Sequence, residues 1–351
     1  KNSPTSPTDE GLNAFFDLGS WMGFSLSDDN TKTGFSGPYI LGMEHGIWVS
    51  NNFTSLDLVA KNGNSLLRNL NYSEQNYFPG RLENQITFEE INLKSTLIFT
   101  SDKSLIISTK ITNNGNQNLE FIPQWKGEIF HQIGRLINND THLITLMDKK
   151  QKIYLSPISD EMFKIHSDSN KYTISFNNII LKPKETKTYS IEIQYHPNQK
   201  KLQKPISKTD VSQATEDNQL RWDKYLEITK TNSLSKEEKL ILTKSICTLI
   251  NNWKSAAGAL RHDGLFPSYH YKWFQGFWSW DSWKHAVALV KIDVELAKNQ
   301  VRAMYDYQNK DGMIADCIFR DTTIEKHNWR DTKPPLSSWT IWEIFKETND
   351  T

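Results

Sequence analysis

The most distinctive chemical feature of the sequence is a run of aromatic side chains that holds one carboxylate. Residues 273–286 are WFQGFWSWDSWKHA, and Asp281 and Lys284 are the only charged residues from Trp273 to Lys284. Trp and Phe rings offer flat apolar faces that stack on the C–H faces of a sugar, and a carboxylate can accept from two adjacent hydroxyls. The segment therefore predicts a pyranose-binding wall, with Trp278, Trp280 and Asp281 as candidate contacts.

A structural alternative for this run is a buried aromatic cluster in which Asp281 caps the helix that follows. An aspartate before a helix is common and stabilises it by about 1 kcal/mol. The alternative explains Asp281 well, but the spacing of Gly276, Trp278 and Trp280 fits no helix face. A ligand wall accounts for them better, and the two roles can coexist.

A second cluster of polar side chains occupies the segment DCIFRDTTIEKHNWRDTKPPL, residues 316–336. Asn328, Arg330 and Lys333 lie there in a loop that leads to a helix, and such a loop can supply donors to a polyol ligand. The alternative is a solvated surface loop in which Arg330 and Asp331 form a weak ion pair. Both interpretations stay open on the residues alone.

Other catalytic chemistries find no support in the pattern. The histidines show no metal-ligand spacing, so no metal site is expected. A Gly-x-Ser-x-Gly nucleophile elbow and a phosphate-binding loop are both absent from the sequence. We expect no cofactor in this chain.

The elements that would position these residues change type along the chain. From about residue 12 to 196 the apolar pattern has a period of two: Leu105, Ile107, Thr109 and Ile111 share one strand face, and Tyr189, Ile191, Ile193 and Tyr195 share another. Turn signals separate these strands at spacings that suit antiparallel hairpins. The pattern predicts a β-sandwich.

Helical periodicity replaces this pattern after a polar, lysine-rich connection at 197–210. Ser235 and Glu238 have capping-box spacing before a face of Leu242, Ile246, Leu249 and Trp253. Further helices are predicted from Ser282 to Ile292, from the cap Asp293 through Tyr305, and after Pro335, where Leu336, Trp339, Trp342 and Phe345 form an apolar stripe.

Helices separated by long loops rich in Trp, Asp and Arg suggest an α/α toroid. The expected fold is therefore an antiparallel β-sandwich followed by the first helices of an (α/α)6 toroid. The predicted domains are a sandwich at 1–196, a linker with a helical segment at 197–233, and a partial barrel at 234–351.

Bulk composition removes several classes of partner. Lys plus Arg and Asp plus Glu are both 41, which argues against nucleic acid. No apolar run approaches the ~20 residues of a membrane span. Cys247 and Cys317 fit buried thiols as well as one bridge. Because the chain starts at Lys1 without a signal sequence, as a mature exported product would, we expect a periplasmic or secreted protein.

Four segments together resemble glycoside hydrolase family 63, and specifically its bacterial oligosaccharide α-glucosidase branch. They are FFDLGSW at 15–21, NNWKSAAGAL at 251–260, WSWDSWKHA at 278–286 and NWRDTKPPLSSW at 328–339. They occur in the family's order and at about its spacing. The resemblance implies an N-terminal sandwich, a catalytic (α/α)6 barrel and inverting hydrolysis of α-glucosidic linkages.

The resemblance also implies a role for individual residues. Asp281 matches an aspartate of the sugar-binding subsite that influences the base side of the reaction, and is our candidate catalytic residue. Trp280 and Lys333 match positions that line the same pocket. Trp278, Asn328 and Arg330 complete the predicted substrate contacts.

The family's two main catalytic carboxylates lie beyond the point that matches Thr351. We therefore expect the N-terminal portion of an α-glucosidase-like hydrolase, acting on α-glucosides or oligosaccharides and inactive alone. Its open helices would be covered by a missing C-terminal barrel segment, a separate chain or self-association. The alternative is a non-catalytic sugar-binding or assembly subunit.

Overall fold

The computed structural model describes residues 1–28, 33–43, 46–67, 72–148, 150–198 and 209–350. The chain divides into two compact units. The first unit, here the sheet unit, comprises 1–15, 22–40 and 47–216; the second, the helical unit, comprises 16–21, 41–46 and 217–351. Most of the connection predicted at 197–210 lies outside the described residues, and the predicted domain boundaries stay predictions.

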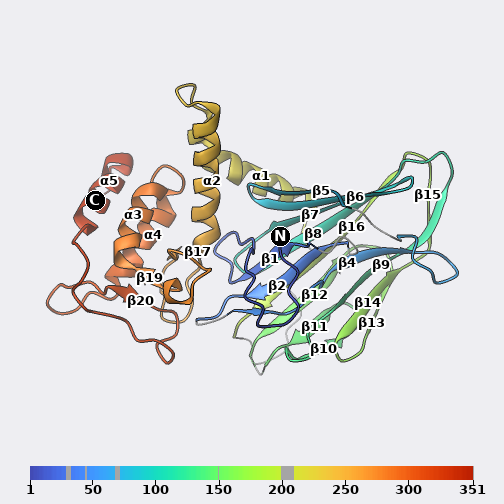
Figure 1. Cartoon of the computed structure of the whole chain (residues 1–351), viewed down its shortest axis with the longest axis horizontal. Coiled ribbons are helices and arrows are strands. Elements are labelled where there is room, and N and C mark those ends of the chain that lie inside the picture. The colour runs from blue at the N-terminus through green and yellow to red at the C-terminus, as the bar shows by residue number, and fades with distance from the viewer. Residues whose placement is uncertain (29–32, 44–45, 68–71, 149, 199–208, 351) are drawn as a thin grey trace. The chain divides into compact units, whose positions relative to one another are not determined.

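The described residues of the sheet unit form three antiparallel sheets (Figure 1). Their strand orders are β1-β2-β3, β10-β11-β12-β16-β8-β7-β6-β5, and β13-β14-β9-β15 with β4 also paired to β9. The strands are β1 Met22–Leu26, β2 Phe35–Ile40, β3 Ile47–Trp48, β4 Ser55–Val59, β5 Tyr72–Phe78, β6 Arg81–Phe88, β7 Ile91–Phe99, β8 Ser104–Asn113, β9 Leu119–Glu128, β10 Arg135–Asn138, β11 Leu143–Leu146, β12 Lys152–Ile158, β13 Phe163–Ser167, β14 Lys171–Phe176, β15 Ile179–Leu181 and β16 Thr186–His196.

The two apolar strand faces predicted from the period of two are cross-strand neighbours. In the pairing of β8 with β16, Leu105 lies opposite Ile193 and Ile107 opposite Ile191, and all four are buried. The second large sheet closes on this face: the rings of Phe176 in β14 and Tyr189 in β16 are 4.8 Å apart. The predicted antiparallel β-sandwich is confirmed.

The helical unit follows in the predicted order. Its elements are α1 Val211–Tyr225, whose first residues belong to the sheet unit, α2 Lys236–Asn252, α3 Ser279–Leu289, α4 Val294–Tyr305 and α5 Ser337–Thr348, with two short ribbons, β17 Trp253–Lys254 with β18 Gly264–Leu265 and β19 Phe277–Trp278 with β20 Cys317–Ile318. None of the described helices is long and apolar enough to span a membrane. A sandwich followed by a helical unit is the fold class that the sequence predicts.

Two helix starts follow the predicted capping chemistry. Ser235 and Glu238 form a complete capping box at the start of α2. Asp293 caps α4 by accepting from the Leu296 amide at 3.0 Å. Side-chain oxygens at these positions satisfy amides that the helix itself leaves unpaired.

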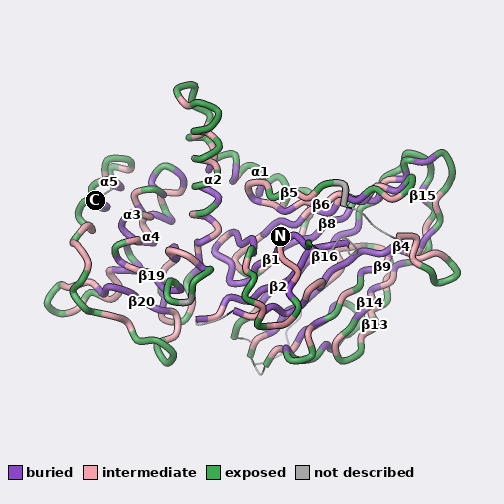
Figure 2. The backbone as a smooth tube through the Cα atoms, viewed as in Figure 1, coloured by how far each residue is buried: buried purple, intermediate pink, exposed green. Residues whose placement is uncertain are grey.

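The apolar face predicted for α2 is partly wrong. The buried side chains are those of Ile246, Cys247, Ile250 and Asn252, whereas Leu240 and Ile241 are exposed. In Figure 2 the free end of α2 is green, the colour of exposed residues. Trp253 lies outside the helix, because its extended backbone begins the ribbon strand β17. The helix therefore packs along its C-terminal half.

Candidate functional site

The aromatic run is positioned by a short ribbon that leads directly into α3. In this ribbon Phe277 pairs with Ile318 and Trp278 with Cys317, and the Ser279 amide donates to the Asp316 carbonyl at 2.9 Å. The extended Trp278 then occupies the N-cap position of α3 without a side-chain cap bond. The ribbon thus ends where the helix begins.

This start corrects the predicted position of Asp281. The sequence predicted a helix from Ser282 to Ile292, which Asp281 would cap in the structural alternative, but α3 spans Ser279–Leu289. Asp281 is therefore the third helical residue. A carboxylate in the first turn still gains from the helix dipole, typically about 0.3–1 kcal/mol, so a structural role for Asp281 persists.

The polar loop folds back onto the ribbon and brings Lys333 to it. Asn328 bridges to Cys317, and its carbonyl accepts from the Asp316 amide at 2.6 Å. The Asp316 carboxylate, only 4% exposed, accepts from the Thr332 hydroxyl at 2.5 Å and the Thr332 amide at 3.3 Å. This buried anchor fixes the backbone immediately before Lys333.

Two lysines lie against the two tryptophans of the predicted wall. The Lys333 ammonium is 5.6 Å from the centroid of the Trp278 ring, and that of Lys284 is 4.2 Å from the Trp280 ring. Both separations are within cation–π range. Sequence analysis did not assign Lys284 a role, although its i,i+4 spacing from Trp280 on a helix was the available signal.

Asp281 lies in the field of both lysines. Partial burial raises the pKa of the Asp281 carboxyl above its ordinary value, while its own backbone amide and the charges of Lys284 and Lys333 act in the opposite direction. Burial also raises the pKa of the Cys317 thiol, and the nearby Asp281 charge adds to that effect. Asp281 therefore lies in the first turn of α3, where the charges of Lys284 and Lys333 favour its ionised form.

The rings around Trp278 form a rim that is packed on one side only. Trp278 packs on Met43, Cys317 and Phe319, and its indole N–H donates to the Trp273 carbonyl at 3.1 Å. Trp273 and Trp280 remain 56% and 40% exposed. Such half-open rings can offer an apolar face to a sugar.

The structure brings together the side chains of four of the six predicted contacts, but not those of Asn328 and Arg330. Trp278, Trp280, Asp281 and Lys333 gather around the ribbon and the start of α3. Asn328 joins them through its backbone. Arg330 is exposed, and the described contacts do not link it to the others. The roles of all six remain predictions.

A buried ion-pair network surrounds Asp17, a residue of the FFDLGSW segment for which the sequence predicted no partner. Asp17 is fully buried and forms a bidentate pair with Arg221, at 2.9 and 2.7 Å, while the Trp222 indole donates to the same carboxylate at 2.9 Å. Bidentate geometry of this kind is the strongest form of Arg–carboxylate contact. The network holds the N-terminal segment 16–21 in the helical unit.

A buried lysine accompanies this network. Lys254 is fully buried, and burial lowers the pKa of its ammonium well below the ordinary value. Its Nζ donates to the carbonyls of Asn251 and Trp253 and lies 4.3 Å from the Phe16 ring centroid. No local pattern in the sequence distinguishes this lysine from a solvated one.

The chain offers no evident metal ligands and no disulfide in its described part. No group of three His, Cys, Asp or Glu side chains suited to a metal occurs among the described residues. Cys247 and Cys317 are buried and form no disulfide. Cavities of about 460, 250 and 200 Å³ are all lined by residues of the sheet unit.

Comparison with solved structures supports the fold. A putative kojibiose phosphorylase from the human microbiome matches with a TM-score of 0.55 and 9% identity, over 96% of this chain and 50% of that chain. This chain thus spans about half the length of that protein. At such low identity the likeness concerns the fold alone.

Two other structures match less of the chain. A galactose mutarotase related enzyme from Lactobacillus acidophilus has a TM-score of 0.36 and 10% identity, over 54% of this chain and 99% of that one. Heparan sulfate lyase HepC from Pedobacter heparinus has a TM-score of 0.30 and 8% identity, over 41% and 24%. These two likenesses carry no argument about this chain.

Family models identify both parts of the sequence. Residues 274–351, which contain the ribbon, α3 and the polar loop, match the model described as the mannosylglycerate hydrolase MGH1-like glycoside hydrolase domain. Residues 5–241 match the model described as the N-terminal part of glucosidase YgjK. Since the second match covers more than half of the chain, this protein belongs to the glucosidase YgjK N-terminal family.

Proposed function

We propose that this chain is the N-terminal portion of an inverting α-glucosidase-like glycoside hydrolase, related to the oligosaccharide α-glucosidase branch of family 63. Its substrates would be α-glucosides or α-glucose-capped oligosaccharides. The observation that carries the proposal is the carboxylate of Asp281, placed beside Trp278 and Trp280 and in the field of Lys333. The two family matches support the glycosidase class.

In this proposal the residues act on one glucosyl unit. Asp281 accepts hydrogen bonds from adjacent sugar hydroxyls, Lys333 donates to another, and the exposed Trp280 ring stacks on a C–H face. The main acid and base of the inverting pair would come from further barrel segments, so residues 1–351 alone would show no appreciable turnover. Those same segments would cover the exposed aromatic face of α5. A periplasmic or secreted location stays a prediction.

The proposal is tested by comparing residues 1–351 with the native protein purified at confirmed mass. Hydrolysis of α-glucosides would be followed by NMR, which identifies the anomer released first. We expect inversion by the native protein, and a 10- to 150-fold weaker sugar affinity in Asp281→Asn, from the loss of about 1.5–3 kcal/mol of charge-assisted hydrogen bonding. Asp311→Asn, at an exposed position of the same unit, is the matched control.

Two outcomes would change the assignment. Sugar binding without hydrolysis by the native protein would favour the non-catalytic sugar-binding or assembly subunit. Equal sugar affinity in Asp281→Asn and Asp311→Asn would remove Asp281 from the site.

A further inference from the structure

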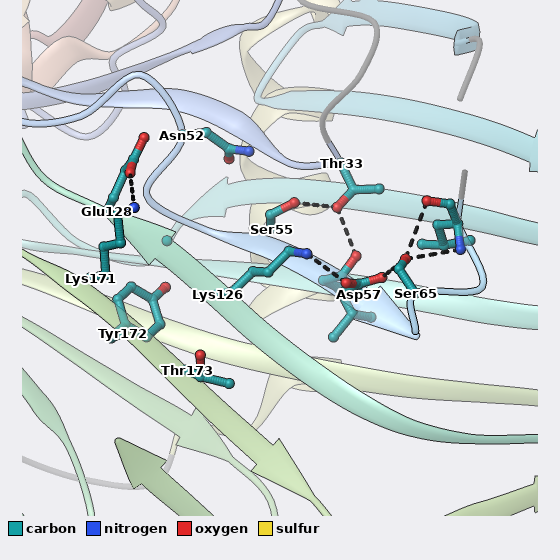
Figure 3. Close-up of a pocket in the computed structure, with 13 residues that line it drawn as sticks. Thr33, Asn52, Ser55, Asp57, Ser65, Lys126, Glu128, Lys171, Tyr172 and Thr173 are labelled. Atoms are coloured by element: carbon teal, nitrogen blue, oxygen red, sulfur yellow. Dashed lines mark hydrogen bonds and ion pairs between the residues drawn. The ribbon is translucent and has the colours of Figure 1, made fainter. Parts of the chain in front are cut away.

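A polar cleft lies in the sheet unit, against strands β4, β9 and β14 (Figure 3). Its volume is about 460 Å³, within the ~300–1,000 Å³ range of small-molecule sites. Every residue that lines it belongs to the sheet unit. The fold and the functional assignment above leave this cleft without a role.

Strand register concentrates polar groups on the face that forms the floor of the cleft. Ser55 lies opposite Lys126, which lies opposite Thr173 on its other side. Cross-strand partners share a face of the sheet, and so do residues two positions apart. Asp57, two residues after Ser55, therefore extends the same polar row.

Asp57 is a buried carboxylate that holds the floor of the cleft together through three hydrogen bonds. It is only 5% exposed, and its carboxylate accepts from Lys126 Nζ at 2.5 Å, Ser65 Oγ at 2.5 Å and the Leu58 amide at 2.9 Å. Figure 3 shows Lys126 and Ser65 converging on it. Because an ammonium carries three donors, Lys126 keeps hydrogen-bonding capacity beyond this pair, and its side chain is 50% exposed.

Asn52 supplies an unsatisfied acceptor in the cleft lining. Its side-chain oxygen is buried and has no donor among the described residues. An unpartnered buried acceptor costs about 1–3 kcal/mol, and rotation of the Asn52 side chain toward the cleft would let a hydroxyl of an occupant satisfy it. Nearby, the Thr33 hydroxyl donates to the Leu56 carbonyl at 2.7 Å and pairs with Ser55.

The charges of the lining select a neutral occupant. Asp57 and Glu128 are balanced by Lys126 and Lys171, and the second pair is 3.7 Å apart. A phosphorylated ligand would be repelled by the two carboxylates, and a polycationic ligand would be repelled by the two lysines. A ligand with many hydroxyls can instead donate to the carboxylates and Asn52 and accept from the lysines.

We propose that this cleft binds a neutral polyhydroxylated ligand, a mono- or disaccharide. The proposal rests on residues of the sheet unit alone and stands apart from the role of Asp281. A sugar held there would be a second carbohydrate contact on the same chain.

The test is a calorimetric titration of residues 1–351 with glucose and with maltose, and with glucose 6-phosphate as the charged comparison. Asn52→Leu removes the unsatisfied acceptor, so its sugar affinity should fall at least tenfold while its melting temperature holds or rises. Thr173→Val should lower the affinity about two- to tenfold. Thr188→Val, at an exposed position of β16, is the matched control and should change nothing.

Each outcome decides the proposal. Saturable binding of a neutral sugar that both cleft variants weaken supports it, as does weaker binding of glucose 6-phosphate. Absence of binding by both neutral sugars at millimolar concentration overturns it. Binding that Asn52→Leu leaves intact but Asp281→Asn or Trp280→Ala abolishes overturns it too, while supporting the Asp281 site.

Discussion

At the scale of single residues, Asp281 experiences two opposed influences. The first turn of α3 and two lysines favour its charge, but partial burial disfavours it more, and the net effect is a raised pKa. The folded state therefore holds the Asp281 proton more tightly than the unfolded chain. Charge at this position is maintained at a cost to stability, as expected of a group retained for binding.

This imbalance predicts the pH dependence of an Asp281→Asn variant. Between the ordinary aspartate pKa of about 3.9 and the raised folded value, the folded state binds more protons, so stability falls as pH rises. At neutral pH the full penalty is present. Asp281→Asn should therefore melt at a higher temperature than the wild type at pH 7, and this gain should vanish below about pH 3.9.

Thermal melts of both proteins from acid to neutral pH measure this effect. Asp311→Asn serves as the exposed control and should track the wild type. A lower melting temperature for Asp281→Asn at pH 7 would contradict the argument and assign Asp281 a net stabilising role.

A second residue-scale prediction concerns Asp17. Unlike that of Asp281, its buried carboxylate has an ion-pair partner, so its charge stabilises the fold. Asp17→Asn leaves the Arg221 guanidinium, 18% exposed, without its buried counter-charge. Breaking such a pair costs about 3–5 kcal/mol. Glu227→Gln breaks an exposed pair, in which the side chains of Glu227 and Lys230 are 70% and 56% exposed, and should change the stability little.

Urea denaturation of both variants provides the comparison. A marked loss for Asp17→Asn alone would confirm that the network ties residues 16–21 to the helical unit. Equal, small losses in the two variants would show that the buried pair contributes little.

At the scale of elements, local signals predicted much of the fold and failed where distant segments meet. The alternation in β8 and β16 and the caps Ser235 and Asp293 depend on near neighbours in sequence, and the structure agrees with them. The start of α3 depends on pairing between β19 and β20, about 40 residues apart. A local pattern carries no record of that pairing, so the predicted helix began three residues late.

The site was predictable to the same extent. Residue chemistry singled out Trp278, Trp280 and Asp281 and offered Lys333 among the loop donors, and the resemblance assigned Lys333 to the same pocket. The Asp17–Arg221 pair joins positions 204 residues apart, and the buried state of Lys254 depends on Phe16. Neither has a local signature, because a lysine or aspartate in isolation is far more often solvated.

The polar loop gives a prediction at the scale of an element. Thr332→Val removes the hydroxyl that donates to the buried Asp316 carboxylate. Leaving that group under-satisfied should cost about 1–3 kcal/mol and release the backbone before Lys333. We expect faster amide exchange across 328–333, and weaker sugar binding at the Asp281 site.

Thr323→Val is the matched control in the same loop. Its hydroxyl donates to Asp321 at 2.6 Å, but that pair is exposed. Hydrogen exchange read by mass spectrometry should leave 328–333 protected in this variant. Loss of protection in both variants, or in neither, would refute the anchoring role of Asp316.

At the scale of the whole chain, α5 has one face buried against its neighbours and one face exposed to solvent. The helix packs against α3 and α4, where Thr340 is fully buried and donates to the Trp283 carbonyl at 3.1 Å, and Ile344 is 7% exposed. The other side exposes Trp339, Ile341 and Trp342 at 42%, 44% and 55%. Clustered exposed aromatic groups of this kind mark an interaction surface.

These faces predict opposite consequences for two truncations on one helix. Ile344→Ala should lower the free energy of unfolding by about 2–5 kcal/mol, because it empties a packed position. Trp342→Ala removes a larger side chain, yet it should cost under about 0.5 kcal/mol, because that ring contributes a stacking contact with Phe345 on an open surface.

The Trp342→Ala variant should also bind less of a hydrophobic dye and self-associate less, as sedimentation would measure. If Trp342→Ala destabilises the chain as strongly as Ile344→Ala, the tryptophan is part of the chain's own core. If it leaves dye binding and sedimentation unchanged, the exposed side of α5 is an ordinary solvated surface, and the barrel segments expected to cover it must dock elsewhere.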